Sequence, residues 1–259
     1  WKYYISSDTG VFLYSQLSAL IHTSYYALYC NFSLLIIINQ LFTEGTDWKK
    51  WIKITFLSIM IFLLGSKTGI LSLAIIFSGL ILYYVVALKK YMYGVILGIS
   101  IILAFTVVMN THFLGERISS VYHQVIRNQN NIKGSSNHLR LAAWEASLNV
   151  FKENKIRGVS PGDVKTSLKK QYQLMNYDKA DKMGLNSHNQ FLQIMVASGI
   201  LGLTVFSLHL FFSFHLAWRK KDYLFLFFMF LICLNLLTES MLETQAGVVF
   251  YLFFFSLFA

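Results

Sequence analysis

The amino-acid sequence predicts an all-α polytopic membrane protein. Three observations carry this prediction: 56% of the 259 residues are hydrophobic, only 13% are charged, and the mean hydropathy is +0.53. Soluble domains have about 25% charged residues, so most of this chain is too apolar to face water. A single proline, Pro161, also leaves the chain with fewer turn-forming residues than a soluble protein of this length needs. The composition therefore excludes a soluble fold.

Several apolar runs are candidates for membrane spans, because a helix needs about 20 apolar residues to cross the hydrocarbon core. The runs cover residues 25–42, 51–64, 70–88, 91–109, 191–218, 223–237 and 247–259. They divide the chain into residues 1–109 with about four spans, a long polar segment over residues 110–188, and residues 189–259 with the remaining spans. The chain begins at Trp1 without a methionine and ends at Ala259 inside an apolar run, so we expect a fragment of a longer protein.

The distribution of basic residues predicts how the spans are oriented. The formal net charge is +10, and the basic residues lie mainly in the long polar segment, whose charge has little influence on topology, and in three short connections between the expected spans. The basic residues of the three connections are Lys49, Lys50, Lys53, Lys89, Lys90, Arg219, Lys220 and Lys221. Counting the spans places all three connections on one side of the membrane, and the positive-inside rule makes that side cytoplasmic. The polar segment over residues 110–188 is therefore expected to be extracytoplasmic.

The polar segment is too long for an unstructured connection and is expected to contain helices. Within it, residues 139–151 have the pattern of an amphipathic helix, with Ser136 or Asn137 as its cap and Gly158 beyond its end. This segment is the sequence's candidate for a small domain outside the membrane.

The strongest local pattern is the run 186–193, which reads Asn-Ser-His-Asn-Gln-Phe-Leu-Gln. Ser187 and Gln190 have the spacing of a capping box, which predicts a helix that begins at His188. The positive end of the helix dipole disfavours imidazolium, so a neutral ring at this place can accept a proton and act as a general base. The alternative is a polar histidine that anchors a span at the membrane interface.

Arg140 is the second candidate, because an arginine near a helix N-terminus opposes the dipole unless an anion lies nearby. Its guanidinium and the free N–H groups of the first helical turn would together bind a phosphate group. Arg140 shares one helix face with Trp144, Ser147 and Phe151. The alternative is an ordinary surface arginine.

Lys67 lies in the tight turn over residues 66–69 and is a further candidate for binding phosphate. The alternative is a lysine whose charged end reaches the interface and anchors the next span. The expected topology also places His22, Glu239 and Glu243 at or near the extracytoplasmic ends of spans. These residues together predict a polar site at that interface.

The sequence gives little support for a metal or a cofactor. His112, His123 and His138 lack the spacing of metal ligands, so no metal site is predicted. The chain contains no Walker loop, no GxGxxG and no GxSxG, so nucleotide hydrolysis and acyl-serine chemistry are not expected.

The motifs, in this order and topology, resemble the superfamily of O-antigen ligases and polymerases, which are bacterial membrane glycosyltransferases. The resemblance spans most of the chain and rests on residues 22–26, 66–69, 140–144, 158–163 and 188–193, followed by Gly199 and Gly202. Two positions depart from the family pattern: Lys67 replaces the usual arginine, and Ser160 replaces a common glycine. A bidentate phosphate contact from position 67 is therefore not expected.

The resemblance implies a GT-C-like helical bundle in the bacterial cytoplasmic membrane that transfers a glycan from undecaprenyl pyrophosphate without a metal or cofactor. The acceptor would be lipid A core, a growing polysaccharide or a protein, with the lipid bilayer as surroundings and no nucleic acid as partner. The family pattern assigns pyrophosphate binding to Arg140 and the position of Lys67, and activation of the acceptor hydroxyl to His188. Secondary candidates for the site are His22, Asn189, Trp144 and Glu239.

Two other classes of function stay open. One is a transporter or flippase of lipid-linked glycans, which forms no new bond, and the other is a structural subunit of an assembly. Transporters commonly hold substrate near the bilayer midplane, whereas the charged candidates here lie near the ends of spans. This placement favours the enzyme.

Overall fold

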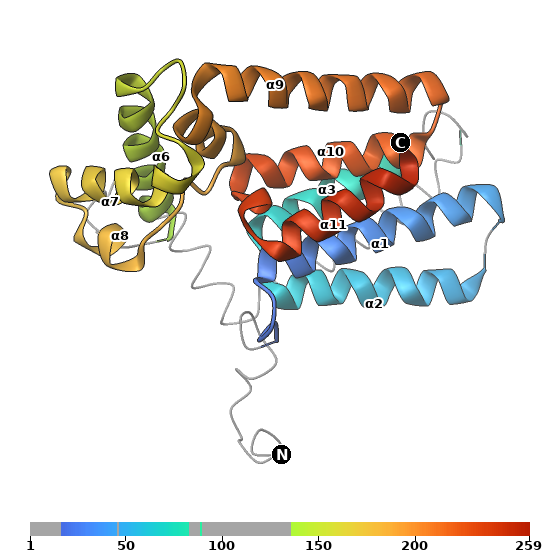
Figure 1. The fold of residues 1–259 in the computed structure, drawn as a ribbon. Coiled ribbons are helices and arrows are strands. Elements are labelled where there is room, and N and C mark those ends of the chain that lie inside the picture. Colours follow the sequence, from blue (N-terminus) through green and yellow to red (C-terminus); the bar gives the residue numbers. More distant parts are fainter. Residues whose placement is uncertain (1–16, 46, 83–88, 90–135) are drawn as a thin grey trace, which may run out of the picture. The chain divides into compact units, whose positions relative to one another are not determined.

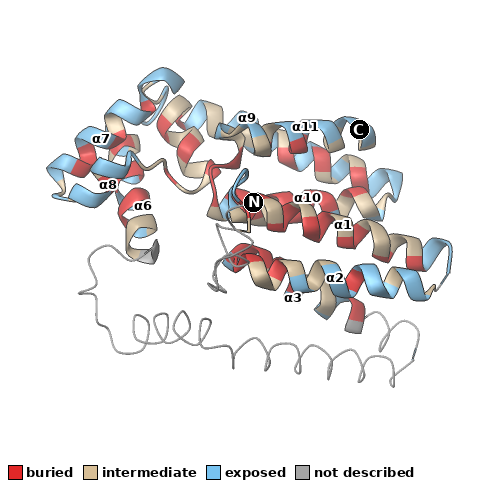
Figure 2. Ribbon diagram, turned by 90° about the horizontal axis from the view of Figure 1, so that it is seen from below, coloured by how far each residue is buried: buried red, intermediate tan, exposed pale blue. Residues whose placement is uncertain are grey.

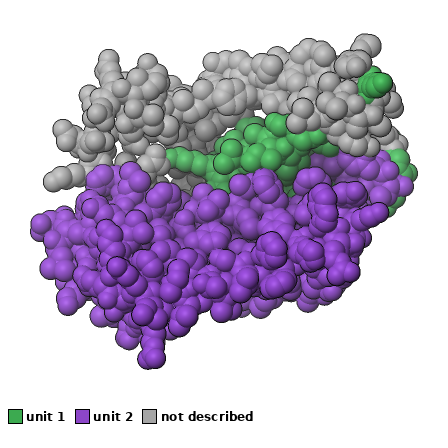
Figure 3. Space-filling view, turned by 90° about the horizontal axis from the view of Figure 1, so that it is seen from above, with its two compact units in different colours: residues 1–37, 44–133 green, residues 38–43, 134–259 purple. Residues whose placement is uncertain are grey.

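The computed structural model describes residues 17–45, 47–82, 89 and 136–259. Every regular element in these ranges is a helix, so the all-α prediction is confirmed for this part of the chain. Residues 1–37 and 44–133 form one compact unit, and residues 38–43 and 134–259 form a second (Figure 3). The expected span over residues 91–109 lies outside the described residues, as do His112 and His123.

Among the described residues, three helices match the first three apolar runs and lie in the first unit, except for residues 38–43 at the end of the first helix, which belong to the second unit. They are α1 (Thr23–Thr43), α2 (Trp48–Leu64) and α3 (Lys67–Leu82) (Figure 1). α2 begins after Asp47, whose side chain accepts a hydrogen bond from the N–H of Lys49. The same helix ends at Gly65, which adopts a left-handed conformation with φ 59°.

α1 and α3 approach each other closely within this unit. A Cβ atom at Gly69 would lie 2.5 Å from the Cβ of Ala27, so glycine permits the contact. Asn31 is fully buried at the crossing and donates from Nδ2 to the carbonyl oxygens of Ala27 (2.9 Å) and Gly69 (3.0 Å). This contact positions the start of α3, where Lys67 lies.

The second unit contains the remaining described helices. They are α6 (Ser136–Glu153), η4 (Pro161–Asp163), α7 (Val164–Leu174), α8 (Asp178–Met183), α9 (Gln190–Lys220), α10 (Tyr223–Thr238), η5 (Met241–Glu243) and α11 (Gln245–Phe258). α9 packs against α10, which packs against α11, and the three helices alternate in direction (Figure 1). α6, α7 and α8 gather at the end of this bundle where α9 begins.

α6, α7 and α8 share a hydrophobic core with the first part of α9. Its buried residues are Ala143, Ala146, Val150, Val164, Leu168, Tyr172, Ala180 and Val196. The helix predicted over residues 139–151 is present as α6, which begins at Ser136 and so includes both residues predicted as its cap, and Gly158 follows it with φ 68°. The described part of the polar segment is therefore folded.

α9 is kinked at Gly199, whose φ of 63° and ψ of −157° are not helical. The loop after α6 is paired with this kink, because Val159 N–H donates to the carbonyl of Val196 (2.9 Å) and Ile200 N–H donates to that of Lys155 (2.8 Å). A Cβ atom at Gly199 would lie 2.3 Å from the carbonyl oxygen of Ile156. Glycine is therefore required by both the conformation and the close backbone contact.

The helices of the second unit differ in how far they are buried. α10 is buried along much of its length, including Phe225, Phe228 and Met229, whereas α9 exposes large apolar side chains such as Val205 and Phe211 (Figure 2). By length and composition, α1 and α9 are sufficient to cross a membrane, and Lys67–Leu80, α10 and α11 are shorter apolar helices. The described fold is consistent with a helical membrane protein.

Candidate functional site

Glu239 joins two other predicted site residues in the second unit. It lies directly after α10, and its side chain is only 8% exposed. Its Oε1 is 2.5 Å from Nη2 of Arg140, and its Oε2 is 3.2 Å from Nδ1 of His188. Arg140 also donates from Nη1 to the carbonyl oxygen of Thr238. We call Arg140, His188 and Glu239 the ionic cluster.

Arg140 reaches this cluster from α6. Small buried residues of the same helix, Ala142, Ala143 and Ala146, bring the helix axis close to its neighbours, which include α9. The sequence predicts that Arg140 needs an anionic partner, and Glu239 is such a partner within the chain. Binding of pyrophosphate by Arg140 stays a prediction.

His188 is not in a helix, so the predicted helix start is wrong. α9 begins at Gln190, and its cap is Asn189, whose Oδ1 accepts from the N–H groups of Phe191 (2.9 Å) and Leu192 (3.1 Å). His188 has φ 45°, and its N–H donates to Oδ1 of Asn186 (3.0 Å). Asn186 and Asn189 therefore bind the backbone on either side of His188, and the helix begins only after Asn189.

Ser187 has a different role from the predicted cap. Its Oγ accepts from Oγ of Ser147 (2.9 Å), and its N–H donates to Oε1 of Gln193 (3.2 Å). These contacts fix the residue before His188 to α6 and α9. The orientation of the imidazole consequently depends on the Glu239 carboxylate rather than on a helix dipole.

Two side chains connect the start of α9 to the segment around Glu239. Asn189 donates from Nδ2 to the carbonyl of Leu237 (3.0 Å), and Oε1 of Gln190 accepts from the N–H of Leu242 (2.8 Å). The contacts of Gln190 with Leu242 and of Gln193 with Ser187 were not expected from the sequence. The two glutamines are three residues apart on one helix face, and burial of that face is the signal that identifies such polar contacts.

The charge state of Glu239 follows from its surroundings. Burial raises the pKa of its carboxyl, but the hydrogen bond with His188 and the positive charge of Arg140 outweigh burial and hold the pKa below its ordinary 4.5. The carboxylate is therefore ionised near neutral pH. A neutral imidazole that donates its Nδ1–H to this carboxylate keeps Nε2 as a proton acceptor.

The other predicted residues are placed as follows. Trp144 follows Arg140 by one turn of α6, and its indole nitrogen is buried without a hydrogen-bond partner in the part of the chain that the structure describes. Glu243 lies in η5 and is exposed. Lys67 is the exposed first residue of α3, and His22 precedes α1, where its Nδ1 accepts from the N–H of Ser24 (3.4 Å); both belong to the first unit.

Within the described ranges, no group of three or more His, Cys, Asp or Glu side chains is arranged to hold a metal ion. A metal-independent reaction stays a prediction. The cluster itself provides two chemical functions: an imidazole oriented by a carboxylate, and a guanidinium with N–H donors beyond those that it uses for Glu239 and Thr238.

In a comparison with known protein families, one family model matches more than half of the chain. The family described as O-antigen ligase matches residues 54–207, a range that includes Lys67, Arg140 and His188 but not Glu239. No curated protein matches the chain. The family consists of integral membrane proteins of bacteria and indicates a ligase or polymerase that acts on lipid-linked glycans. The chain belongs to the O-antigen ligase family.

Proposed function

We propose that this protein is a multi-pass glycosyltransferase that moves a glycan from undecaprenyl pyrophosphate to an acceptor hydroxyl on the outer face of the cytoplasmic membrane. The acceptor is lipid A core, a growing polysaccharide or a protein side chain. The observation that carries the proposal is the Glu239 carboxylate, which contacts both Arg140 and His188. Membership in the O-antigen ligase family supports the same reaction class.

His188 is the general base in this mechanism. Its Nδ1–H donates to Glu239, so Nε2 faces the acceptor hydroxyl and takes its proton while the acceptor oxygen attacks the anomeric carbon. The bond between the anomeric carbon and the pyrophosphate oxygen breaks, and its electron pair leaves with undecaprenyl pyrophosphate. The Glu239 carboxylate stabilises the imidazolium that forms, as a buried carboxylate does in other histidine-dependent enzymes.

Arg140 stabilises the charge on the leaving group. Two of its nitrogens bind Glu239 and the carbonyl of Thr238, which fixes the plane of the guanidinium. Its remaining N–H donors bind the pyrophosphate as negative charge grows on the bridging oxygen. In the second unit, Trp144 and Asn189 are proposed as secondary residues of this site. The roles of Lys67 and His22, which belong to the first unit, stay predictions from the sequence.

The proposed topology is a GT-C-like bundle in which the α6–α8 segment is extracytoplasmic. It is supported by the position of Arg219, Lys220 and Lys221 at the opposite end of α9 from the ionic cluster, since basic residues mark the cytoplasmic side.

The test compares single variants of the full-length protein in a transfer assay with lipid-linked donor and acceptor in liposomes. His188→Ala should lower the rate by about 10²–10⁴-fold and keep donor binding, because a general base acts on the acceptor. Arg140→Ala should lower both donor affinity and rate, and Arg140→Lys should restore only part of either. Metal chelation with EDTA should leave the rate of the wild type unchanged.

Glu239→Gln tests the orientation of the imidazole, because the amide keeps the shape of the side chain and removes its charge. We expect a loss of rate without a comparable loss of donor binding. The matched control is Glu243→Gln, the same change at an exposed residue four positions away. A His188→Ala variant that transfers glycan at the wild-type rate contradicts the mechanism, and movement of lipid-linked glycan across liposomes without a new glycosidic bond supports a transporter instead.

A further inference from the structure

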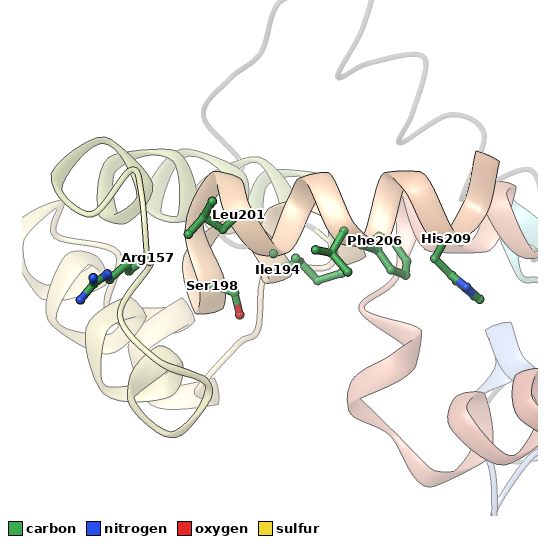
Figure 4. A pocket seen from close by; sticks show the side chains of 8 residues that line it. Arg157, Ile194, Ser198, Leu201, Phe206 and His209 are labelled. Atoms are coloured by element: carbon green, nitrogen blue, oxygen red, sulfur yellow. The ribbon is translucent and has the colours of Figure 1, made fainter. Parts of the chain in front are cut away.

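An open groove of about 620 Å³ follows one face of α9 in the second unit. Its lining residues are Arg157, Ile194, Ser198, Leu201, Gly202, Val205, Phe206 and His209. Figure 4 shows Arg157 at one end of this row and His209 at the other, with the apolar side chains between them. The groove is separate from the described contacts of the ionic cluster, because it shares no residue with that cluster.

The apolar part of the groove has the dimensions of a lipid chain. Beyond the kink, the helix rises by about 12 Å from Leu201 to His209, which is most of one leaflet of a hydrocarbon core of about 30 Å. The polar group at the far end is satisfied within the protein, because Nε2 of His209 is 2.5 Å from Oη of Tyr251. A hydrocarbon chain can therefore lie along this face without burying an unpaired group there.

The near end of the groove carries positive charge on a fixed backbone. Lys155 and Arg157 are exposed on either side of Ile156, and neither cation pairs with an acidic side chain in the part of the chain that the structure describes. Their loop is bound to α9 beyond the kink, because Ile200 N–H donates to the carbonyl of Lys155 (2.8 Å). Arg157 is thus held at one end of an apolar surface, where a phosphate headgroup of a lipid would lie.

We propose that this groove binds an anionic phospholipid, with its phosphate at Arg157 and one acyl chain along Leu201, Val205 and Phe206. Charge complementarity selects an anionic headgroup over a zwitterionic one, since Arg157 lines this end of the groove and no acidic side chain lines it. The site is independent of the proposed transfer reaction. A protein without transferase activity would bind the lipid equally well.

The experiment measures binding of phosphatidylglycerol and phosphatidylcholine to the purified full-length protein in detergent by native mass spectrometry. Phosphatidylglycerol should bind about tenfold more tightly, because its headgroup has a net negative charge beside Arg157, whereas the choline of phosphatidylcholine would place a second cation there. Arg157→Ala should remove about this factor, and Arg157→Lys should keep most of it. Lys165→Ala is the charge-matched control on α7, where the lysine is also exposed, and should leave binding unchanged.

The acyl-chain part is tested by filling the groove. Val205 is exposed and lines the groove, whereas Leu208 is exposed on the same helix and does not. Val205→Trp should weaken phosphatidylglycerol binding about tenfold, and Leu208→Trp should not, with both variants unfolding at the wild-type temperature. Equal binding of the two lipids, or equal effects of the two tryptophans, would overturn the proposal. Displacement of the lipid by glycerol phosphate alone would also overturn the proposal. Displacement by undecaprenyl phosphate at equal concentration would overturn it too, because it would assign the groove to the proposed donor.

Discussion

The two parts of α9 on either side of Gly199 are built for different surroundings. The part before the kink carries the buried side chains Gln190, Gln193 and Val196, which bind the site segment or join the core beneath α6. The part after the kink exposes apolar side chains, and its His209 contacts Tyr251 of α11. α9 thus combines a part that positions the ionic cluster with a part whose exposed surface is apolar, as in a helix that crosses a membrane, and the kink separates the two.

Substitution of the kink residue should have the largest effect on this division. Gly199→Ala places a Cβ atom 2.3 Å from the carbonyl oxygen of Ile156 at a residue with φ 63°. The contact is with backbone, so relief requires movement of the loop after α6, and we expect a loss of about 3–5 kcal/mol in stability. Thermal unfolding in detergent measures it.

Gly162→Ala is the matched control for this variant. Gly162 lies in η4 of the same unit, and a Cβ atom there would meet no atom within 4 Å. Its unfolding temperature should equal that of the wild type. A Gly199→Ala protein that is as stable as the control would show that the kink is not maintained by this close contact.

The same substitution on the two parts of α9 sharpens the comparison. Val196 is fully buried in the core with α6 and α7, whereas Val205 is 69% exposed. Val196→Ala should cost about 2 kcal/mol because it leaves a cavity, and Val205→Ala should change stability by less than about 0.5 kcal/mol. Denaturation of both variants in the same detergent gives the difference. Equal losses would mean that the second part is packed against protein.

The cap of α9 should contribute less than the core. Asn189→Ala removes the acceptor for Phe191 and Leu192 and the donor to Leu237, at a cost of about 1–2 kcal/mol. Asn189→Asp keeps the acceptor and loses the donor, so about half of the stability loss should remain. If the aspartate variant is as unstable as the alanine variant, the contact with Leu237 dominates, and the helix cap is of little importance.

Much of the fold could be predicted from the sequence, because apolar runs and helical spacing are local signals. Lys67 at the start of α3 and the helix around Arg140 are of this kind. The start of α9 could not be predicted, because Ser187 and Asn189 both have cap chemistry and the choice depends on a tertiary contact of Ser187 with Ser147.

The ionic cluster was predictable only in part. Arg140 near a helix start called for an anion, but nothing local relates it to Glu239, which lies 99 positions later. The proximity of His188 to Glu239 likewise arises from the packing of α9 against α10. The sequence identified the three residues of the cluster from their types and their places at expected span ends. The contacts between them could be seen only in the folded structure.

The smallest effect expected is a dependence of stability on acid, because burial of Glu239 opposes the two ionic contacts that lower its pKa. The pKa in the folded protein lies below the ordinary 4.5, so the contribution of the carboxylate is fully present above that value and is lost as the pH falls through the lower folded pKa. Below that point the protonated carboxyl no longer pairs with Arg140, which is partly buried.

The stability of the wild type should therefore decrease as the pH falls. Unfolding in detergent between about pH 6 and pH 3 measures this decrease, because that range brackets the transition. The Glu239→Gln variant cannot take up a proton at this position, so its stability should decrease less over the same range, while Glu243→Gln should follow the wild type because that residue is exposed. An identical acid dependence in the Glu239→Gln variant would show that the carboxylate that contacts His188 is not coupled to folding, and the distinction between the two parts of α9 would then rest on packing alone.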